Sequence, residues 1–450
     1  MGKYFGTDGI RGRASVQFPP LFVFKLGIAA AHVLSKEVAD RRPLILIGKD
    51  TRISGDFLES ALAAGMAAGG CDIMLLGVIP TPGVAALTRL LQADAAAVIS
   101  ASHNPYYDNG IKFFTADGYK LPDELEEQIE QLIDSYGDQL PFATDDKLGR
   151  ISSYQNAAGE YAAWLQEEQA PNLLGLKIVV DTANGAASAI AGPLFESLGA
   201  AVVCMANEPD GCNINLNCGS THLDALCQRV LSERADIGLA FDGDADRILA
   251  VDENGQEVDG DHLLAILATD MKQKGELAAN ELVVTQMSNM GLKLAMEKLG
   301  VQVAETKVGD RYVLERMREI GASLGGEQSG HIIFLDENTT GDGLLSALHL
   351  LEVMVVTGKP LSELSKIMTV LPQALVNVTV PNHRKEHFME YPEIAAAIEE
   401  LEKEFAGEGR VLIRPSGTEP KVRVMIEGKD KARIDKEAHR IADLIQQLML

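Results

Sequence analysis

The sequence VISASHNPYYDNGIKFF, residues 98–114, sets a polar turn directly after an apolar run. That run, Ala95–Ile99, predicts a buried strand, because short apolar segments bounded by turn residues are typical of parallel sheets. Pro105 cannot continue a strand ladder, and it pushes Asn104 toward an extended conformation. We therefore expect Ser102 on a sharp turn at the carboxyl end of a strand, where open α/β sheets bind ligands. Its hydroxyl can act there as a nucleophile or phosphate carrier; the alternative is a turn without chemistry.

The composition excludes several classes of protein. The 450 residues, 46% of them apolar and 5% aromatic, indicate a multidomain α/β protein. A net charge of −25 argues against a nucleic-acid-binding or anionic-membrane surface, and the apolar run Gly343–Val356 is too short to span a bilayer. The N-terminus lacks a signal-peptide core, and five cysteines without a C-x-x-C pair favour free thiols. We expect a cytoplasmic protein that can form a homodimer and has neither nucleic-acid nor membrane partners.

A pattern of strand, helix, strand, helix, strand occurs three times along the chain. The passes begin at Leu44–Asp50, Lys177–Gly185 and Glu281–Asn289, and each closes in a loop rich in functional groups. Strands that alternate with helices indicate parallel sheets with right-handed connections, so the closing loops should occupy equivalent places. We predict four domains around a central cleft: three similar mixed or parallel α/β domains, 1–152, 153–255 and 256–368, and a C-terminal α+β domain, 369–450.

The second closing loop, Asp242-Gly243-Asp244-Ala245-Asp246-Arg247, follows a predicted strand at 237–240. Carboxylates at alternate positions of a glycine-containing turn can converge on one hard cation, and without a cation their mutual repulsion would raise their pKa values. An EF-hand begins with the same spacing, but it requires glycine at the sixth position, which is Arg247 here. We expect Mg²⁺ rather than Ca²⁺, because three monodentate carboxylates leave positions for phosphate oxygens.

Three other segments carry groups that suit a phosphosugar. In the loop 326–331, Glu327 and Ser329 can bind sugar hydroxyls or an amine, and His331 can shuttle a proton; a plain glycine-rich turn is the alternative. The segment RPSGTEPKVR, 414–423, offers two arginines, two hydroxyls and a glycine amide to a dianionic phosphate, unless it is a hairpin with exposed arginines. Arg11, in FGTDGIRG, could neutralise a phosphate.

Two acidic motifs imitate metal sites. Asp259-Gly260-Asp261 and Gly341-Asp342-Gly343 each precede an apolar helical run. An aspartate at a helix start accepts hydrogen bonds from unpaired backbone amides, so N-cap roles are expected for these motifs.

Taken in order, FGTDGIRG, ISASHNP with GIKFF, FDGDADR, GEQSGH and RPSGTEPKVRV resemble the motifs of the α-D-phosphohexomutase superfamily over essentially the whole chain. Val308–Val313 and Gln328 point to its bacterial glucosamine-phosphate branch. The resemblance implies a phosphomutase that interconverts hexosamine 6- and 1-phosphates through a phosphoserine and a 1,6-bisphosphate, which serves as intermediate and activator. The product would feed UDP-N-acetylglucosamine and peptidoglycan precursor synthesis. The alternatives are a phosphomannomutase/phosphoglucomutase, an aspartyl-phosphate phosphatase with Asp242 as nucleophile, and a non-catalytic phosphosugar-binding protein.

The resemblance also implies roles for individual residues. Ser102 would be phosphorylated and would hold one Mg²⁺ together with Asp242, Asp244 and Asp246. The transferring phosphoryl group would be surrounded by Lys112, as the proton acceptor, and by Arg11, His103 and His331. The substrate would be bound by Arg247, Glu327, Ser329, Arg414, Ser416, Gly417, Thr418 and Arg423.

Overall fold

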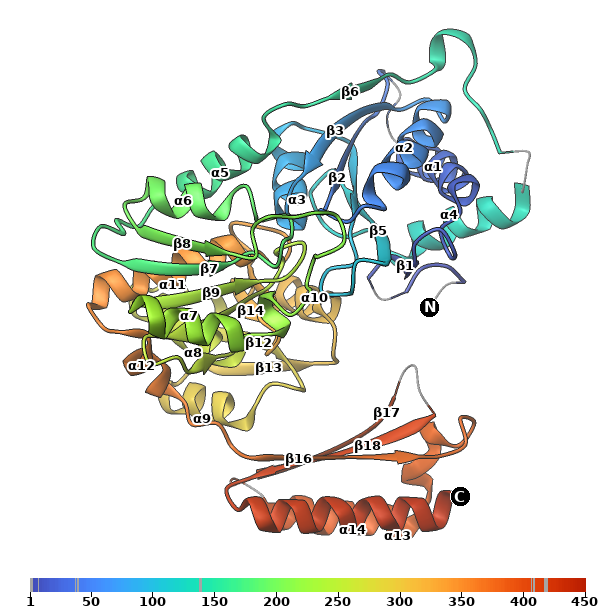
Figure 1. Cartoon of the computed structure of the whole chain (residues 1–450). Coiled ribbons are helices and arrows are strands. Elements are labelled where there is room, and N and C mark those ends of the chain that lie inside the picture. Colours follow the sequence, from blue (N-terminus) through green and yellow to red (C-terminus); the bar gives the residue numbers. More distant parts are fainter. Residues whose placement is uncertain are drawn as a thin grey trace. The chain divides into compact units, whose positions relative to one another are not determined.

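The computed structural model describes the chain apart from residues 1–2, 7, 37, 39, 137–139, 406, 408 and 417–419. The chain divides into two compact units (Figure 1). The first consists of Met1–Met287 and Val301–Ile367, and the second of Ser288–Gly300 and Met368–Leu450. The first unit contains three sheets and the second contains one.

The first sheet of the first unit has the strand order β1-β5-β4-β2-β3-β6. Its elements are β1 Ile10–Arg13, α1 Pro20–Leu34, β2 Leu44–Lys49, α2 Gly55–Ala68, β3 Asp72–Val78, α3 Thr81–Leu90, β4 Ala95–Ile99, β5 Asp108–Thr115, α4 Asp123–Tyr136 and β6 Ile151–Ser153. Successive side chains of a strand point to opposite faces. On β2, Ile45 and Ile47 join a core with α1 and α2, whereas a side chain at Gly48 would meet Val84 of α3. The helices α1 and α2 therefore cover one face, and α3 covers the other.

Two further sheets complete the first unit, with strand orders β11-β10-β9-β7-β8 and β13-β12-β14-β15. The elements around the second sheet are α5 Ala157–Glu168, β7 Lys177–Asp181, α6 Ala191–Ser197, β8 Ala201–Met205, α7 Asp224–Glu233, β9 Ile237–Phe241, β10 Ile248–Asp252 and β11 Glu257–Val258. Those around the third are α8 Gly260–Lys274, β12 Glu281–Thr285, β13 Gln302–Thr306, α10 Asp310–Ile320, β14 Leu324–Gly326, β15 Ile332–Phe334, α11 Gly343–Thr357 and α12 Leu361–Leu364. Buried apolar side chains on both sheets and their helices form the cores.

The three closing loops occupy the same place in the three sheets. Each follows a strand with a parallel neighbour, β4 beside β2, β9 beside β7 and β14 beside β12, as the alternation of strands and helices predicts. Each then leads into an antiparallel strand, β5, β10 or β15. A short loop can join only antiparallel neighbours, because a parallel return needs a longer crossover. The functional groups are thus held at hairpin ends.

Asp259 and Asp342 are helix N-caps, as their sequence context predicts. The Asp259 side chain accepts a hydrogen bond from the backbone N–H of His262, and Asp342 accepts one from Leu345. Among the described residues, no single helix is long and apolar enough to cross a membrane. Two consecutive helical segments, 343–357 and 361–367, reach that length and apolar character only when taken together, and the chain bends by 91° between them.

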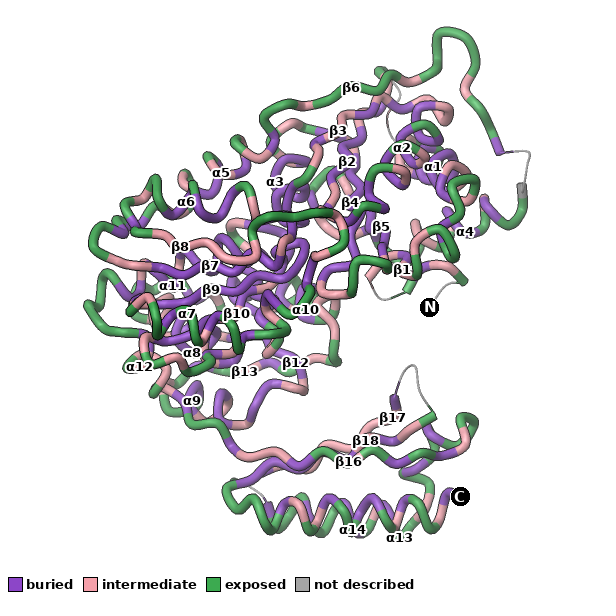
Figure 2. Tube along the Cα trace, in the orientation of Figure 1, coloured by how far each residue is buried: buried purple, intermediate pink, exposed green. Residues whose placement is uncertain are grey.

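The second unit is a three-stranded antiparallel sheet, β16-β18-β17, with α13 and α14 packed on one face (Figure 2). Its elements are α9 Met290–Leu299, β16 Gln373–Thr379, α13 Pro392–Phe405, β17 Gly409–Pro415, β18 Lys421–Gly428 and α14 Lys431–Met449. Alternate residues Val422, Val424 and Ile426 of β18 enter the core, so Arg423 points to the face away from the helices.

The helix α9 lies between β12 and β13 in the chain, where the repeat pattern puts it, but by its contacts it groups with the C-terminal segment. The reason is local. Asn289 Nδ2 donates to the carbonyl of Leu371, and the Leu371 N–H donates back to Asn289 Oδ1, at 3.0 Å each. This reciprocal pair fastens the start of α9 to the chain that leads into β16.

Candidate active site

Ser102 follows β4 with a left-handed backbone conformation, φ 51°, and only 1% of the residue is exposed. A non-glycine residue in this region costs about 1–3 kcal/mol and persists only where its surroundings hold it. The hydroxyl Oγ donates a 2.6 Å hydrogen bond to Asp242 Oδ2, which lies 140 positions further along the chain. The first and second closing loops therefore meet at this contact.

Asp242, Asp244 and Asp246 are buried and offer carboxylate oxygens that all lie within 4.8 Å of one another. Burial, followed by repulsion from Asp246 and Asp244, raises the pKa of Asp242 well above its usual range. Among the described residues, Oδ1 of Asp244 and Oδ1 of Asp246 have no hydrogen-bond partner. Buried, unpartnered carboxylate oxygens are costly unless something binds them, and together with Ser102 Oγ they fit a hard divalent cation such as Mg²⁺.

Thr81, the first residue of α3, holds the metal loop from the first sheet. Its Oγ1 donates to Asp244 Oδ2 at 2.7 Å, and its backbone N–H donates to the Asp244 carbonyl at 3.0 Å. The sequence shows Thr81 only as part of a Thr-Pro helix start, which has the same appearance whether or not it carries a function.

His103 lies beside Ser102, with its Nδ1 3.2 Å from Ser102 Oγ. Arg247 Nη1 is 3.2 Å from His103 Nδ1, and since a guanidinium only donates, Nδ1 is the acceptor and the imidazole is neutral. Burial and the neighbouring charges of Arg247 and Arg11 lower the pKa of His103 to about 4. Within the described part of the chain, the buried Nε atoms of both arginines form no hydrogen bond, and Arg247 Nε lies 3.8 Å from Asp246 Oδ1. These donors suit the oxygens of a phosphate on Ser102.

Two lysines and two further carboxylates form a chain of ion pairs that begins at Asp244 of the metal loop. Lys112 Nζ lies 3.3 Å from Asp244 Oδ2 and 3.0 Å from Asp8 Oδ2. Lys120 Nζ binds Asp8 Oδ1 at 2.5 Å and also contacts Asp310, the first residue of α10. Burial opposes the charge of Lys112, but Asp244 and Asp8 outweigh it and raise the pKa of Lys112. Asp8, Lys120 and Asp310 were not selected from the sequence, because charged residues in loops usually lie at the surface.

His331 lies between Asp310 and Asp246 and so completes a closed circuit of charged and polar side chains, here called the ring: Asp8, Lys112, Asp246, His331, Asp310 and Lys120. Its Nε2 lies 3.6 Å from Asp310 Oδ2, and its Nδ1 lies 3.6 Å from Asp246 Oδ2. The Gly341 N–H donates to Nε2 at 3.1 Å, which leaves the ring proton on Nδ1, facing Asp246. Burial opposes protonation, but Asp246 and then Asp310 raise the pKa of His331. A side chain at Gly341 would collide with this imidazole at 2.6 Å, so glycine is needed there.

The loop 327–331 between β14 and β15 is a tight turn in which the Glu327 N–H donates to the His331 carbonyl at 3.0 Å. Glu327 Oε1 accepts from the Gly309 N–H at 3.2 Å, and Gln328 Nε2 donates to Asp259 Oδ2 at 3.0 Å. Ser329 is exposed at the tip of the turn. The loop thus presents one anchored carboxylate and one accessible hydroxyl.

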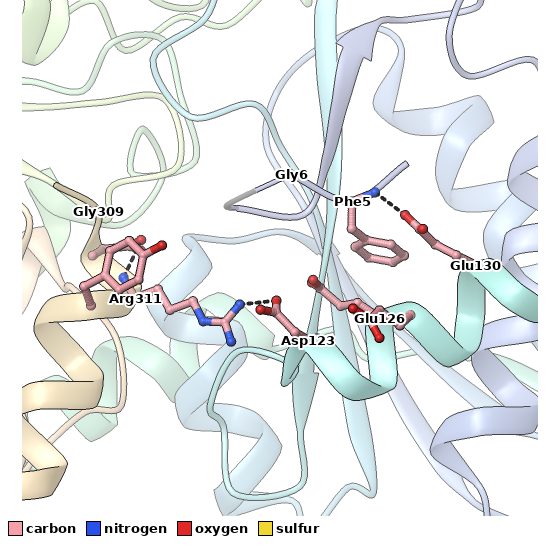
Figure 3. Close-up of a pocket in the computed structure, with 10 residues that line it drawn as sticks. Phe5, Gly6, Asp123, Glu126, Glu130, Gly309 and Arg311 are labelled. Atoms are coloured by element: carbon pink, nitrogen blue, oxygen red, sulfur yellow. Dashed lines mark hydrogen bonds and ion pairs between the residues drawn. The ribbon is translucent and has the colours of Figure 1, made fainter. Parts of the chain in front are cut away.

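A cavity of about 120 Å³ lies beside the ring (Figure 3). It is lined by Phe5, Gly6, Asp123, Glu126, Glu127, Glu130, Gly309, Asp310, Arg311 and Tyr312. Glu130 accepts from the backbone N–H of Tyr4 and of Phe5, and Arg311 pairs with Asp123. Burial and the charge of Asp123 raise the pKa of Glu126 to about 7. These contacts join the N-terminal segment, α4 and the start of α10.

The second unit carries the predicted phosphate-binding arginines. Arg414 and Arg423 are direct partners across β17 and β18, and burial together with the charge of Arg423 lowers the pKa of Arg414. Residues directly opposite each other on neighbouring strands share a face of the sheet, so both guanidinium groups point to the same face. The buried Ser416 has its Oγ 3.5 Å from Arg423 Nη2, and its carbonyl accepts from Lys385 Nζ at 2.6 Å. Gly417 and Thr418 lie outside the described residues.

The first unit therefore gathers most of the predicted site: Arg11, Ser102, His103, Lys112, Asp242, Asp244, Asp246, Arg247, Glu327 and His331. The fold and this site define a phosphohexomutase. Family models of phosphoglucomutase/phosphomannomutase match four successive parts of the chain: α/β/α domain I at 2–139, α/β/α domain II at 153–255, α/β/α domain III at 259–371 and the C-terminal domain at 375–444. The chain belongs to the phosphoglucomutase/phosphomannomutase family and is a phosphomutase, an isomerase.

The curated relatives carry a more specific name. Phosphoglucosamine mutase of Caldanaerobacter subterraneus is 53% identical over 447 residues, which cover 99% of both chains. Phosphoglucosamine mutase of Brevibacillus brevis is 49% identical over 450 residues and all of both chains. A solved phosphoglucomutase/phosphomannomutase family protein from Burkholderia thailandensis has the same fold, with a TM-score of 0.83 at 24% identity over 99% of this chain and 98% of that one.

Proposed function

We propose that the chain acts as a phosphoglucosamine mutase, which interconverts glucosamine 6-phosphate and glucosamine 1-phosphate. The observation that carries this proposal is the 2.6 Å hydrogen bond from Ser102 Oγ to Asp242. Asp242 belongs to a cluster of three aspartates, two of which have a carboxylate oxygen without a hydrogen-bond partner among the described residues. The choice of glucosamine is supported by the two relatives of that name, which are about half identical over the full length. The product would supply UDP-N-acetylglucosamine and peptidoglycan precursors.

In the first half of the reaction, phosphorylated Ser102 gives its phosphoryl group to O1 of glucosamine 6-phosphate. The bond between Oγ and phosphorus breaks, a bond between O1 and phosphorus forms, and the proton that leaves O1 ends on Ser102 Oγ. Lys112, whose raised pKa keeps it protonated, is proposed to give a proton to Ser102 Oγ as the bond to phosphorus breaks and to take up the proton that leaves O1. Arg11, Arg247, His103 and His331 orient the phosphoryl oxygens, since this chemistry depends mainly on positioning and charge neutralisation. Mg²⁺ held by Asp242, Asp244 and Asp246 would supply further neutralisation.

In the second half, the 1,6-bisphosphate turns end for end, and Ser102 Oγ accepts the phosphoryl group from O6. The bond between O6 and phosphorus breaks, and O6 recovers the proton that Oγ loses. Throughout, Glu327 and Ser329 would bind the sugar. The phosphate that is not being transferred would be bound by Arg414, Ser416, Gly417, Thr418 and Arg423, and the placement of the two arginines opposite each other on one face of the sheet supports this role.

The test compares the wild-type protein with Ser102→Ala and with the control Ser153→Ala on the exposed strand β6. We expect Ser102→Ala to lower kcat at least about 1000-fold while it binds glucosamine 6-phosphate within a few-fold of wild type. Intact mass before and after hydroxylamine separates a phosphoserine, which survives, from an acyl phosphate on Asp242. Full turnover by Ser102→Ala would exclude the serine as carrier. A kcat/KM for glucose or mannose phosphate above that for glucosamine phosphate would reassign the substrate.

A further inference from the structure

The carbonyl oxygen of Ser102 is held from two sides. Arg52 Nη2 donates to it at 2.8 Å, and Asn215 Nδ2 donates to it at 2.9 Å. Arg52 follows β2 of the first sheet, whereas Asn215 lies in the loop between β8 and α7 of the second. We infer that Arg52 and Asn215 are positioning residues, which hold Ser102 in its left-handed conformation with Oγ directed at Asp242. The inference rests on the proposed role of Ser102 as phosphate carrier.

Arg52 holds the turn from within the first sheet. Its side chain is fully buried and pairs through Nε with Asp50 Oδ2 at 2.8 Å. Its Nη1 donates to the carbonyls of Pro105 and Asp108, on either side of the loop that returns to β5. A buried charge is strongly unfavourable unless it is paired and hydrogen-bonded, and Arg52 is both. Its donors therefore fix three carbonyls of the Ser102 loop relative to β2.

The same ion pair also fixes the amide of Ser102. Ser100 Oγ donates to Asp50 Oδ2 at 2.7 Å. The same Ser100 Oγ accepts a hydrogen bond from the Ser102 N–H at 2.9 Å. Both polar groups of the Ser102 backbone are thus hydrogen-bonded within one buried network. The arrangement provides the support that a strained backbone conformation requires.

Asn215 connects the turn to the sheet that carries the metal loop. It is 8% exposed, has a left-handed backbone itself, φ 58°, and its Nδ2 also donates to the Asn104 carbonyl at 3.1 Å. A side chain at Gly243, within the metal loop, would come 2.6 Å from the Ser102 carbonyl oxygen. Asn215 and Gly243, both from loops of the second sheet, therefore contact the Ser102 carbonyl oxygen. These contacts set the distance between Ser102 Oγ and Asp242.

Asn215→Asp tests the inference. The aspartate keeps the size of the side chain and its tolerance of the left-handed region, but it loses both N–H donors and places a carboxylate against two carbonyl oxygens. Asn217→Asp is the matched control, because Asn217 lies in the same loop, has φ 53° and is exposed. The readouts are the rate at which glucosamine 1,6-bisphosphate phosphorylates Ser102, followed by intact mass, and kcat and KM for glucosamine 6-phosphate.

We expect Asn215→Asp to slow phosphorylation and kcat about 10- to 100-fold with KM changed less than about threefold, because a displacement near 1 Å has that effect. Asn217→Asp should match wild type. Asn215→Gly, which keeps the backbone conformation without the donor, should also be slow. Wild-type phosphorylation rates in both Asn215 variants, or a loss of thermal stability alone, would overturn the inference. Failure of wild-type Ser102 to take up phosphate would instead refute the proposed function.

Discussion

The hydroxyl of Thr81 donates a 2.7 Å hydrogen bond to Oδ2 of Asp244, across 163 positions of the chain. Lys112 Nζ lies 3.3 Å from the same oxygen. The other oxygen, Oδ1, is left without a partner among the described residues. The hydrogen bond from Thr81 therefore determines which oxygen of Asp244 faces a cation, although Thr81 is not itself a ligand.

Replacement of Thr81 by valine should weaken metal binding. Valine has nearly the same shape but no hydroxyl, so Asp244 becomes free to rotate, and loss of such an outer partner lowers metal affinity about 10-fold or more. Thr88→Val is the control, since Thr88 lies on the same helix and donates only to the Val84 carbonyl. The Mg²⁺ concentration for half-maximal activity, measured after chelator treatment, should rise in Thr81→Val alone. Equal values in both variants would contradict this account of Asp244.

Lys120→Met should impair both stability and turnover. The substitution leaves Asp8 and Asp310 without their shared cation, and because these side chains are largely buried the loss of stability should approach the roughly 3 kcal/mol of a fully buried pair. We expect a lower melting temperature and a kcat reduced about 10-fold, because Asp8 also pairs with Lys112.

Lys49→Met provides the comparison for Lys120. Lys49 also bridges two carboxylates, Asp56 and Glu59, but it lies away from the ring, and Asp56 is exposed. Because Lys49 and Glu59 are as deeply buried as Lys120 and its two partners, this replacement should lower the melting temperature to a similar extent but leave kcat unchanged. Normal kcat in Lys120→Met, measured on folded protein, would remove Lys120 from the site.

Arg423→Ala should raise KM with a smaller effect on kcat. Removal of one guanidinium relieves the repulsion with Arg414 but leaves a phosphate with fewer charge-assisted hydrogen bonds. Steady-state kinetics with glucosamine 6-phosphate should show KM about 10-fold higher or more. Arg433→Ala is the control, because Arg433 pairs with Glu404 on the opposite, helical side of the same unit. An unchanged KM in Arg423→Ala would remove the second unit from phosphate binding.

Asp342 gives a prediction for the pH dependence of stability. Burial raises its pKa from 3.8 to about 6, although it also accepts hydrogen bonds from Leu345, Tyr161 and Asn338. The folded protein therefore binds the proton more tightly than the unfolded chain. The resulting stabilisation is complete below about pH 4 and is lost as pH rises through 6, by roughly 3 kcal/mol.

Asp342→Asn removes this titration. Melting temperatures of wild type and variant, measured from pH 4 to pH 7, should converge or cross as pH rises, because only the wild type loses the proton. A wild-type stability that climbs over the same interval relative to the variant would show that the pKa of Asp342 is lowered instead. Asp336→Asn, on the connection between β15 and α11, serves as the control for loss of one carboxylate.

Much of the fold follows from local sequence. Apolar runs such as Ala95–Ile99 and Ile237–Phe241 form buried strands because transfer of their side chains from water to the protein interior is favourable. Asp259 and Asp342 cap helices because each precedes an apolar helical run. The grouping of α9 with the C-terminal segment did not follow, because it depends on Asn289 meeting Leu371, and such a contact leaves no pattern in either segment.

The candidate site divides in the same way. Ser102, the three aspartates and the arginines are recognisable from the chain because each stands in a short turn whose residue types already restrict the chemistry. Thr81, Lys120, Asp310, Arg52 and Asn215 gain their roles only from the packing of separate sheets, which brings their donors within hydrogen-bond reach of atoms more than 45 positions away. A hydrogen bond depends on distance in space, so residues whose contribution is only such a bond become identifiable once the chain has folded.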